Sequence, residues 1–161
     1  MNSGKVFESD FKKSVPPNIY YYRLRDGTAS WSGGETRFQA TNDYDCSLFD
    51  GDVLVTCELK SVKGKSIPFS NIKKNQIDGL RKACEFRNVI SVIIINFRET
   101  NQTYAIPIIA LTGFMNLTTK KSINITDCES LGVAIESTLK RTRSSYDIRE
   151  MIDNLKVYDG I

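Results

Sequence analysis

The sequence predicts an α/β fold, and three observations lead to it. Two strand-like runs, over 44–49 and 53–60, are joined by an Asp-Gly-Asp turn that is typical of a β-hairpin. The stretch "VISVIIINF" over 89–97 is so continuously apolar that it should lie buried in the centre of a sheet. Segments with the helical spacing of apolar residues precede and follow these strands. We therefore expect one sheet with helices packed around it.

The N-terminal elements follow from spacing and from proline. Apolar residues recur at helical spacing over 4–15, and Pro16 and Pro17 cannot continue a helix. The segment 18–26, "NIYYYRLRD", predicts a strand. The segment 26–39 is rich in Gly and Ser and predicts a surface loop.

The C-terminal elements alternate between helix and strand. The spacing predicts a helix over 71–86, despite Gly79 inside it. Two strands are expected over 89–97 and 102–111. Apolar residues at helical spacing predict a closing amphipathic helix over 145–155.

Composition limits the classes of protein to which the chain can belong. It has 161 residues, of which 40% are hydrophobic and 25% charged, so we treat 1–161 as a single globular domain. No apolar run approaches the roughly 20 residues of a membrane span, and the first residues do not resemble a signal peptide, so a cytoplasmic protein without a membrane partner is expected.

Cysteine and histidine usage narrows the chemistry. The four cysteines show no C-x-x-C spacing and there is no histidine, which argues against a zinc site and against a histidine base. Reduced, buried thiols are expected. The net charge of +3 is small, so a nucleic-acid site must come from local clusters of basic residues.

The second strand of the hairpin ends in two charges one residue apart. Side chains alternate along a strand, so Glu58 and Lys60 share one face, while the apolar residues Val53, Val55, Cys57 and Leu59 share the other. A carboxylate and an amine at the edge of a core need a partner, a metal or a substrate. The alternative is a solvated Glu-x-Lys pair on an exposed strand.

The turn decides which aspartate faces Glu58. If Gly51-Asp52 forms the two-residue loop, Asp45 lies opposite Glu58 and Cys46 lies opposite Cys57; if Asp50-Gly51 forms it, Asp43 lies opposite Glu58 instead. Two facing carboxylates repel, and a hard divalent cation such as Mg²⁺ offsets this repulsion. Lys60 adds a positive charge beside them. The reaction that needs these groups together is metal-assisted phosphodiester hydrolysis.

The pattern D-x(12)-E-x-K, from Asp45 to Glu58 and Lys60, resembles the PD-(D/E)xK nuclease core. More narrowly, the chain resembles RecU-type Holliday junction resolvases, including their phage-borne relatives. The residues that carry this likeness are "NSGKVFESDF", "TNDYD", "CELKS", "SIPFSNIKKNQIDGL", "KKSI" and "YDIREMIDNL". The chain departs from the family at 26–39, where a longer excursion is shortened, which affects the mode of junction engagement more than the chemistry.

The resemblance implies a fold and an activity. The fold is a restriction-endonuclease-like core, with a central mixed β-sheet flanked by helices. The activity is paired nicking of four-way DNA junctions in recombination or phage DNA processing, by a Mg²⁺-dependent homodimer that needs no small-molecule cofactor; Mn²⁺ is the alternative metal. Because active-site residues specify the bond broken and not the DNA shape, a restriction or repair nuclease remains the alternative, and a non-catalytic DNA-binding module is a further one.

Roles carry over from the family to matching positions. Asp45 and Glu58 would bind the metal, with Asp43 in reserve, and Lys60 would orient the attacking water and stabilise the transition state. The resemblance also implies that Glu8 lies near the metal site. The alternative for Glu8 is a helical pair with Lys12.

The remaining expected roles concern the DNA. The resemblance implies that Gln76 lies near the attacking water or the scissile phosphate. The alternative is that Gln76 only binds a backbone group. DNA contacts are expected from the lysines that flank the catalytic strand and open the next helix, and later basic clusters and open-base stacking are further candidates. These residues are Lys63, Lys65, Lys73 and Lys74, then Lys120, Lys121, Lys140, Arg141 and Arg143, and the aromatic residues Tyr20 to Tyr22 and Trp31. The strand of Tyr20 to Tyr22 and the loop 26–39 are also the expected dimer surfaces.

Overall fold

The computed structural model of the protein describes residues 2–26 and 41–161. Its elements are, in chain order, α1 (Ser3–Ser14), β1 (Tyr20–Arg23), β2 (Cys46–Phe49), β3 (Leu54–Val62), β4 (Ser66–Pro68), a 3₁₀ turn η1 (Phe69–Asn71), α2 (Lys74–Ala83), β5 (Val89–Phe97), β6 (Gln102–Pro107), α3 (Ile108–Leu117), β7 (Ser122–Asn124), α4 (Ile125–Leu131), β8 (Val133–Ala134), β9 (Ser137–Lys140), β10 (Arg143–Tyr146) and α5 (Ile148–Asp159).

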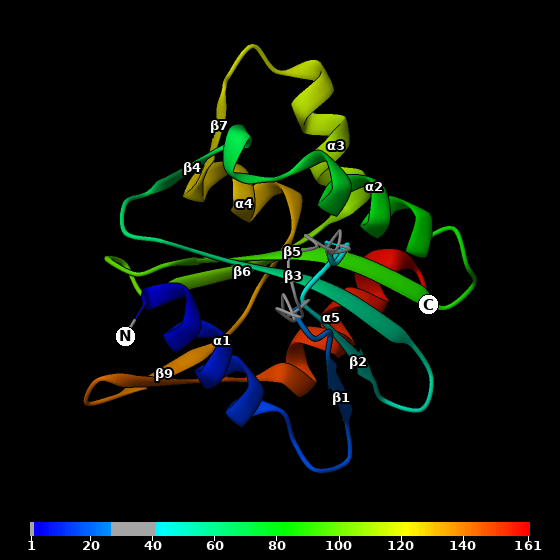
Figure 1. Ribbon diagram of the computed structural model, residues 1–161, viewed down its shortest axis with the longest axis vertical. Coiled ribbons are helices and arrows are strands. Elements are labelled where there is room, and N and C mark those ends of the chain that lie inside the picture. The colour runs from blue at the N-terminus through cyan, green and yellow to red at the C-terminus, as the bar shows by residue number, and fades with distance from the viewer. Residues whose placement is uncertain (1, 27–40) are drawn as a thin grey trace, which may run out of the picture.

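A six-stranded sheet forms the middle of the molecule, in the order β1-β2-β3-β5-β6-β8. β3 and β5 run parallel over nine residue pairs, while the other neighbours are antiparallel. The pairs β4–β7 and β9–β10 form two small separate ribbons. Figure 1 shows helices on both sides of the central sheet. The prediction of an α/β fold with a mixed central sheet flanked by helices is therefore confirmed.

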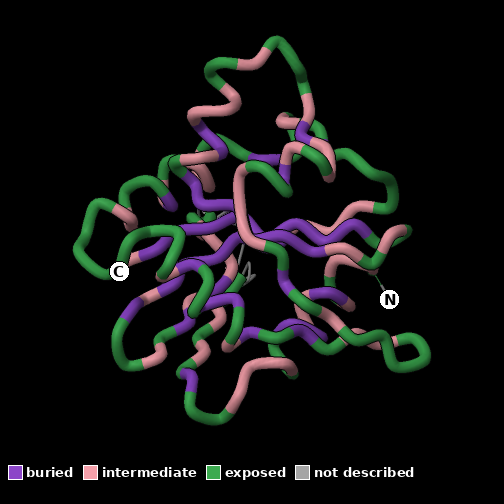
Figure 2. The backbone as a smooth tube through the Cα atoms, turned by 180° about the vertical axis from the view of Figure 1, so that it is seen from behind, coloured by how far each residue is buried: buried purple, intermediate pink, exposed green. Residues whose placement is uncertain are grey.

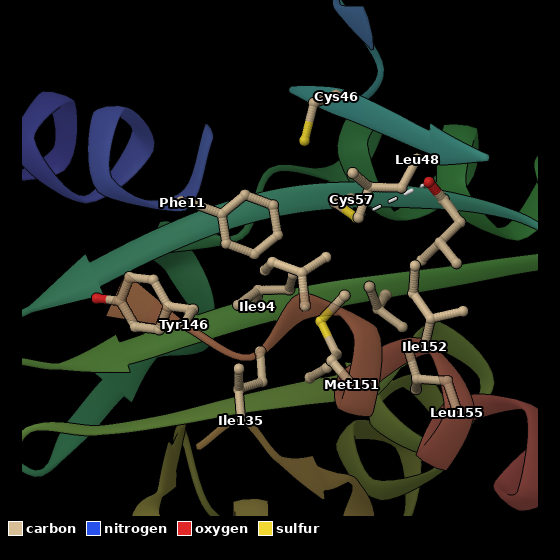
Figure 3. Packing of buried hydrophobic residues seen from close by; sticks show 14 of the residues in the cluster. Phe11, Cys46, Leu48, Cys57, Ile94, Ile135, Tyr146, Met151, Ile152 and Leu155 are labelled. Atoms are coloured by element: carbon tan, nitrogen blue, oxygen red, sulfur yellow. Dashed lines mark hydrogen bonds between the residues drawn. The ribbon is translucent and has the colours of Figure 1, made fainter. Parts of the chain in front are cut away.

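One face of the sheet packs against α1 and α5. Phe7 and Phe11 of α1 meet Tyr146 at the end of β10, and the Phe7 and Tyr146 rings are 5.5 Å apart, edge to face. Met151, Ile152 and Leu155 of α5 fill the rest of this face (Figure 3). Helix α5 begins where the Asp147 carboxylate accepts from the N–H of Glu150, and ends at Gly160 in the left-handed conformation.

The opposite face packs against α2, α3 and α4. Leu80 of α2, Leu111 of α3 and Cys128 of α4 lie over Ile93 and Ile95 of β5. β5 is buried from both sides, as its continuous apolar sequence predicts, and the buried part of the tube in Figure 2 runs through the central strands.

The hairpin has the register set by a Gly51-Asp52 turn. Cys46 pairs with Cys57, and Phe49 pairs with Leu54. The expected burial of Cys46 and Cys57 on the apolar face is confirmed, and both thiols are free. Of the four cysteines, Cys84 is only half-buried, so the expectation that all are buried holds for three.

Several boundaries differ from the sequence prediction. The strand expected over 102–111 ends at Pro107, and Ile108 begins α3, because an apolar run fits a buried helix as well as a strand. The helix expected over 71–86 begins only at Lys74, after the η1 turn. β1 is shorter than predicted, and α5 starts and ends three to four residues later. Apart from Asp26, the predicted loop 26–39 lies outside the described residues.

Among the residues that the structure describes, no helix is both long and apolar enough to cross a membrane.

Candidate active site on strand β3

The site is centred on Glu58, in the middle of β3. The residue is only 3% exposed, although it carries a carboxylate. Its Oε1 lies 2.9 Å from the Nζ of Lys60 and accepts a 2.6 Å hydrogen bond from the Nε2 of Gln76. The alternative of a solvated Glu-x-Lys pair is therefore wrong, because α2 covers this face of the strand.

Gln76 holds Glu58 and Lys60 together. It is the third residue of α2, and its Oε1 accepts from Lys60 Nζ at 3.1 Å and from the backbone N–H of Lys73 at 3.0 Å. These contacts determine the orientation of the Gln76 amide. In the flipped orientation its NH₂ would face the two donors, Lys60 Nζ and the Lys73 N–H, and its oxygen would face the Glu58 carboxylate. Gln76 thus lies beside Glu58 and Lys60 and also makes a backbone contact, while its expected place near the water or the scissile phosphate stays a prediction.

Asp45 immediately precedes β2 and lies opposite Glu58 of the neighbouring strand β3. Its Oδ2 accepts a 2.7 Å hydrogen bond from the N–H of Leu59, and its own N–H donates to the carbonyl of Cys57. These two hydrogen bonds hold Asp45 opposite Glu58, as the register with a Gly51-Asp52 turn predicts. Burial raises the pKa of Asp45, the Leu59 N–H opposes this increase, and the charge of Glu8 adds to it.

The pKa of Glu58 rises to about 7. Burial is the main cause, and the negative charge of Asp45 adds to it, while Lys60 opposes both through its hydrogen bond and its charge. Burial thus raises the pKa values of both carboxyl groups, and titratable groups with pKa values perturbed in this way are concentrated at functional sites.

Asp43 lies beside the site rather than in the strand. Its side chain rests on Gly79 of α2, where a Cβ would come within 2.2 Å of the Asp43 Cβ. The carbonyl of the neighbouring Asn42 accepts from the side chain of Asn75, also on α2. Gly79 therefore has a packing role, since it lets the segment before β2 lie close to the helix.

Glu8 of α1 pairs with Arg23 and not with Lys12. Its Oε2 lies 3.1 Å from Arg23 at the end of β1, and among the described residues this is its ion pair, so the expected alternative with Lys12 is wrong. The charge of Glu8 is close enough to raise the pKa of Asp45. The sequence carried no signal for Arg23, because the pair depends on how α1 crosses the sheet.

The four lysines expected to contact DNA are all exposed but do not form one group. Lys73 and Lys74 open α2 beside Gln76, and Lys74 pairs with Asp78 one turn along. Lys63 and Lys65 lie on the turn after β3, beyond its carboxyl end. Of the later basic residues, Lys120 is neutralised by Asp127.

The tyrosines of β1 point in alternate directions. Tyr21 packs against the core on the α1 side. Tyr20 and Tyr22 are 62% and 50% exposed, and their pairing with Phe49 and Ser47 places them on the face of the sheet that carries Glu58. Packing against the core therefore accounts for Tyr21 but not for the exposed Tyr20 and Tyr22.

The donor set fits a hard divalent cation. Asp45 and Glu58 offer carboxylate oxygens, and Mg²⁺ is commonly held by one or two carboxylates, with water and substrate phosphate completing its shell. No cluster of three or more His, Cys, Asp or Glu side chains occurs within 2–26 and 41–161. The two carboxylates are thus the protein ligands that this arrangement offers first, with Asp43 nearby.

Comparison with known proteins agrees with the predicted resemblance. The chain is similar to the SPbeta prophage-derived uncharacterized protein YotM of Bacillus subtilis (strain 168), with 32% identity over 170 residues that cover 96% of this chain and 87% of that protein. It is also similar to the solved structure of Hjc from Archaeoglobus fulgidus, a Holliday junction resolvase from an archaeal hyperthermophile. That match has a TM-score of 0.48 and 13% identity, and covers 73% of this chain and 83% of the other. The model of the family described as Recombination protein U (RecU) matches residues 11–150. The chain therefore belongs to the RecU family.

Proposed function

We propose that this chain is a divalent-cation-dependent DNA endonuclease that resolves four-way junctions by paired nicking. The observation that carries the proposal is the buried Glu58, which is held by Lys60 and Gln76 and faces Asp45. Membership of the RecU family supports a role in recombination, and the similarity to a prophage protein supports a role in phage DNA processing.

Asp45 and Glu58 would hold the cation, with Mg²⁺ as the first choice and Mn²⁺ as the alternative. When bound, the cation supplies Lewis-acid stabilisation of the charge that develops on the phosphate. A carboxyl pair with raised pKa values supports this assignment, because a bound cation would favour the ionised forms that burial disfavours.

Lys60 and Gln76 act on the substrate side. In hydrolysis, a water oxygen bonds to phosphorus and the bond from phosphorus to a sugar oxygen breaks. The Lys60 ammonium stabilises the negative charge of the transition state and orients the water. Gln76 positions both Lys60 and Glu58, because its amide contacts each of them. Glu8 and Arg23 act from further away, by setting the charge near Asp45.

The active form is proposed to be a two-fold symmetric dimer. Two opposed nicks need two sites, and a closed symmetric dimer presents identical sites to strands of like polarity. Among the residues that the structure describes, β1 is one of the two edge strands of the sheet, and it exposes Tyr20 and Tyr22 beside Phe49. An aromatic edge strand is suited to pairing with a second copy. Light scattering should give twice the 18.2 kDa mass of the chain.

The proposal is tested with a mobile four-way junction, a fork and a linear duplex of the same sequence, in Mg²⁺, in Mn²⁺ and in EDTA. Paired nicks in the junction with either metal, absent in EDTA, are expected. Equal cutting of the duplex would favour the alternative of a restriction or repair nuclease. Binding without cutting of any of the three would favour a non-catalytic module.

A further inference from the structure

The small ribbon β9–β10 is an exposed feature that the proposed active site does not use. Its two-residue turn, Arg141-Thr142, joins Lys140 to Arg143. Arg141 has a φ of 56°, in the left-handed region where glycine is preferred over residues with side chains. The turn thus places an exposed arginine, beside an exposed lysine, at the outermost point of the ribbon.

The ribbon is held firmly against α1. The carboxylate of Asp10, which is 5% exposed, accepts from the Nε of Arg143 at 2.6 Å and from the backbone N–H of Ser144 at 3.0 Å. The hydroxyl of Ser14 accepts from the N–H of Tyr146 at 2.9 Å. The charge of Arg143 is neutralised by this contact, while Lys140 and Arg141 have no ion-pair partner among the residues that the structure describes. A tip fixed in this way loses little conformational freedom when it binds.

The tip lies at the same end of the molecule as two turns of the main sheet. The N–H groups of Arg98 and Glu99, after β5, donate to the carbonyls of Val62, the last residue of β3, and of Lys63, which follows it. A pocket of about 320 Å³ lies between Arg98, the start of α1 and the ribbon residues Leu139 and Thr142. Both Figure 1 and Figure 2 show the two turns, the N-terminal end of α1 and the ribbon tip at one end.

This end is strongly positive. We call it the basic edge and define it by five exposed cations: Lys63, Lys65, Arg98, Lys140 and Arg141. The exposed acidic residue on the same turns is Glu99. Arg98 donates to the hydroxyls of Ser3 and Ser61, which keep its charge in place without neutralising it. The excess of positive charge fits a polyanion such as duplex DNA, whose phosphates lie in a regular row.

The distance from the carboxylates suggests what the basic edge contacts. Lys63 follows Glu58 by five residues of extended chain, which is about 17 Å. With about 3.4 Å for each base pair, a DNA arm that runs along β3 would reach the basic edge about 5 base pairs from the cut. We propose that the basic edge, including the β9–β10 tip, binds the phosphate backbone of a duplex arm at that distance from the scissile phosphate. This inference rests on the proposed function, and it assigns the arm-binding surface.

The test variant is Lys140→Ala/Arg141→Gly. It removes both free charges of the tip, and glycine adopts the left-handed conformation of residue 141 without strain, so the turn should fold. The matched control is Lys12→Ala/Lys13→Ala, which removes two exposed charges from the last turn of α1. Binding to a four-way junction is measured by fluorescence anisotropy in Ca²⁺ over a range of salt concentrations, with circular dichroism to check the fold.

The tip variant should lower the slope of log Kd against log salt by about 1.8, because each phosphate contact contributes about 0.9. At about 0.2 M salt this corresponds to a Kd that is raised roughly 10- to 20-fold. A hydroxyl-radical footprint should lose protection about 5 base pairs from the cut and keep it at the cut. The control should match the wild type.

The two failures are distinguishable. If the wild type binds and cuts the junction but the tip variant has the slope, Kd and footprint of the control, the inference is wrong and the proposed function stands. If the wild type neither binds nor cuts any DNA, the proposed function is wrong. Unchanged DNA binding by the tip variant, together with lost binding to an acidic protein, would assign the basic edge to a protein partner and also overturn the inference.

Discussion

Replacing Glu58 with Gln should change how the stability of the metal-free protein depends on pH. Glu58 is 3% exposed, and its pKa in the folded protein is about 7, compared with 4.5 for an ordinary glutamate. Burial and the charge of Asp45 cause the increase. Between these two values the folded protein binds a proton that the unfolded chain has released, so the free energy of unfolding falls as the pH rises through this window.

The size of the effect follows from the two pKa values. The difference between about 7 and 4.5 corresponds to about 3 kcal/mol of free energy of unfolding. The glutamine side chain is neutral at every pH and can still accept the hydrogen bond from Gln76. The variant should therefore gain about 3 kcal/mol relative to the wild type between pH 4.5 and pH 8.

Urea unfolding curves in EDTA, recorded for both proteins at half-unit steps of pH, measure this difference. Saturating Mg²⁺ should then stabilise the wild type more than the variant at pH 8, because ligand binding to the folded state adds to its stability. Two pH profiles that run parallel in EDTA would refute the reasoning, since they would mean that Glu58 is not protonated in the fold at pH 6.

Three further predictions concern the surroundings of the site. Gly79→Ala should lower the free energy of unfolding by about 1–3 kcal/mol, because the added Cβ would overlap the side chain of Asp43. The control Gly113→Ala, in α3 with open space around it, should raise the free energy of unfolding by about 1 kcal/mol. Thermal melts that show equal effects of the two substitutions would contradict this prediction. Asp50→Asn should cost about 3 kcal/mol or more in urea melts at pH 7 and flatten the loss of stability below pH 4. Burial raises the pKa of this carboxyl, but Lys156 of α5 and the N–H groups of Val53 and Asp52 hold it well below its usual range. An unchanged acid transition would be evidence against this prediction. Gln76→Ala should slow junction cleavage about 10- to 100-fold at saturating DNA while the circular dichroism spectrum stays the same, and an unchanged rate would remove Gln76 from the site.

The hairpin was the part of the fold that sequence could predict in most detail. Alternation along a strand placed Glu58 and Lys60 on one face, and the glycine-containing turn left two registers that differ in the aspartate opposite Glu58. The structure has the register that brings Asp45 there. Local patterns are informative here because the hairpin is formed by neighbours in the sequence.

The remaining geometry depends on contacts between distant segments. The contact between Asp43 and Gly79 joins residues whose relation has no sequence pattern, and the pair of Glu8 with Arg23 depends on the path of α1 across the sheet. The first four residues of helix α3 were predicted as the end of a strand, because a continuous apolar run gives no periodicity to separate the two. The ribbon β9–β10 was not predicted either, since its short strands contain mostly polar residues and show no apolar alternation.

The most direct measurement compares cleavage of an end-labelled mobile four-way junction by the wild type and by Glu58→Gln in Mg²⁺, with junction affinity measured in parallel in Ca²⁺. The wild type should give symmetric paired nicks. The variant should bind the junction and keep its fold, but its cleavage should fall by at least about a hundredfold, because one carboxylate of the proposed cation site is gone. Cleavage by Glu58→Gln at the wild-type rate, or a wild type that leaves the junction intact in Mg²⁺ and in Mn²⁺, would contradict the assignment of nuclease activity to Asp45, Glu58 and Lys60.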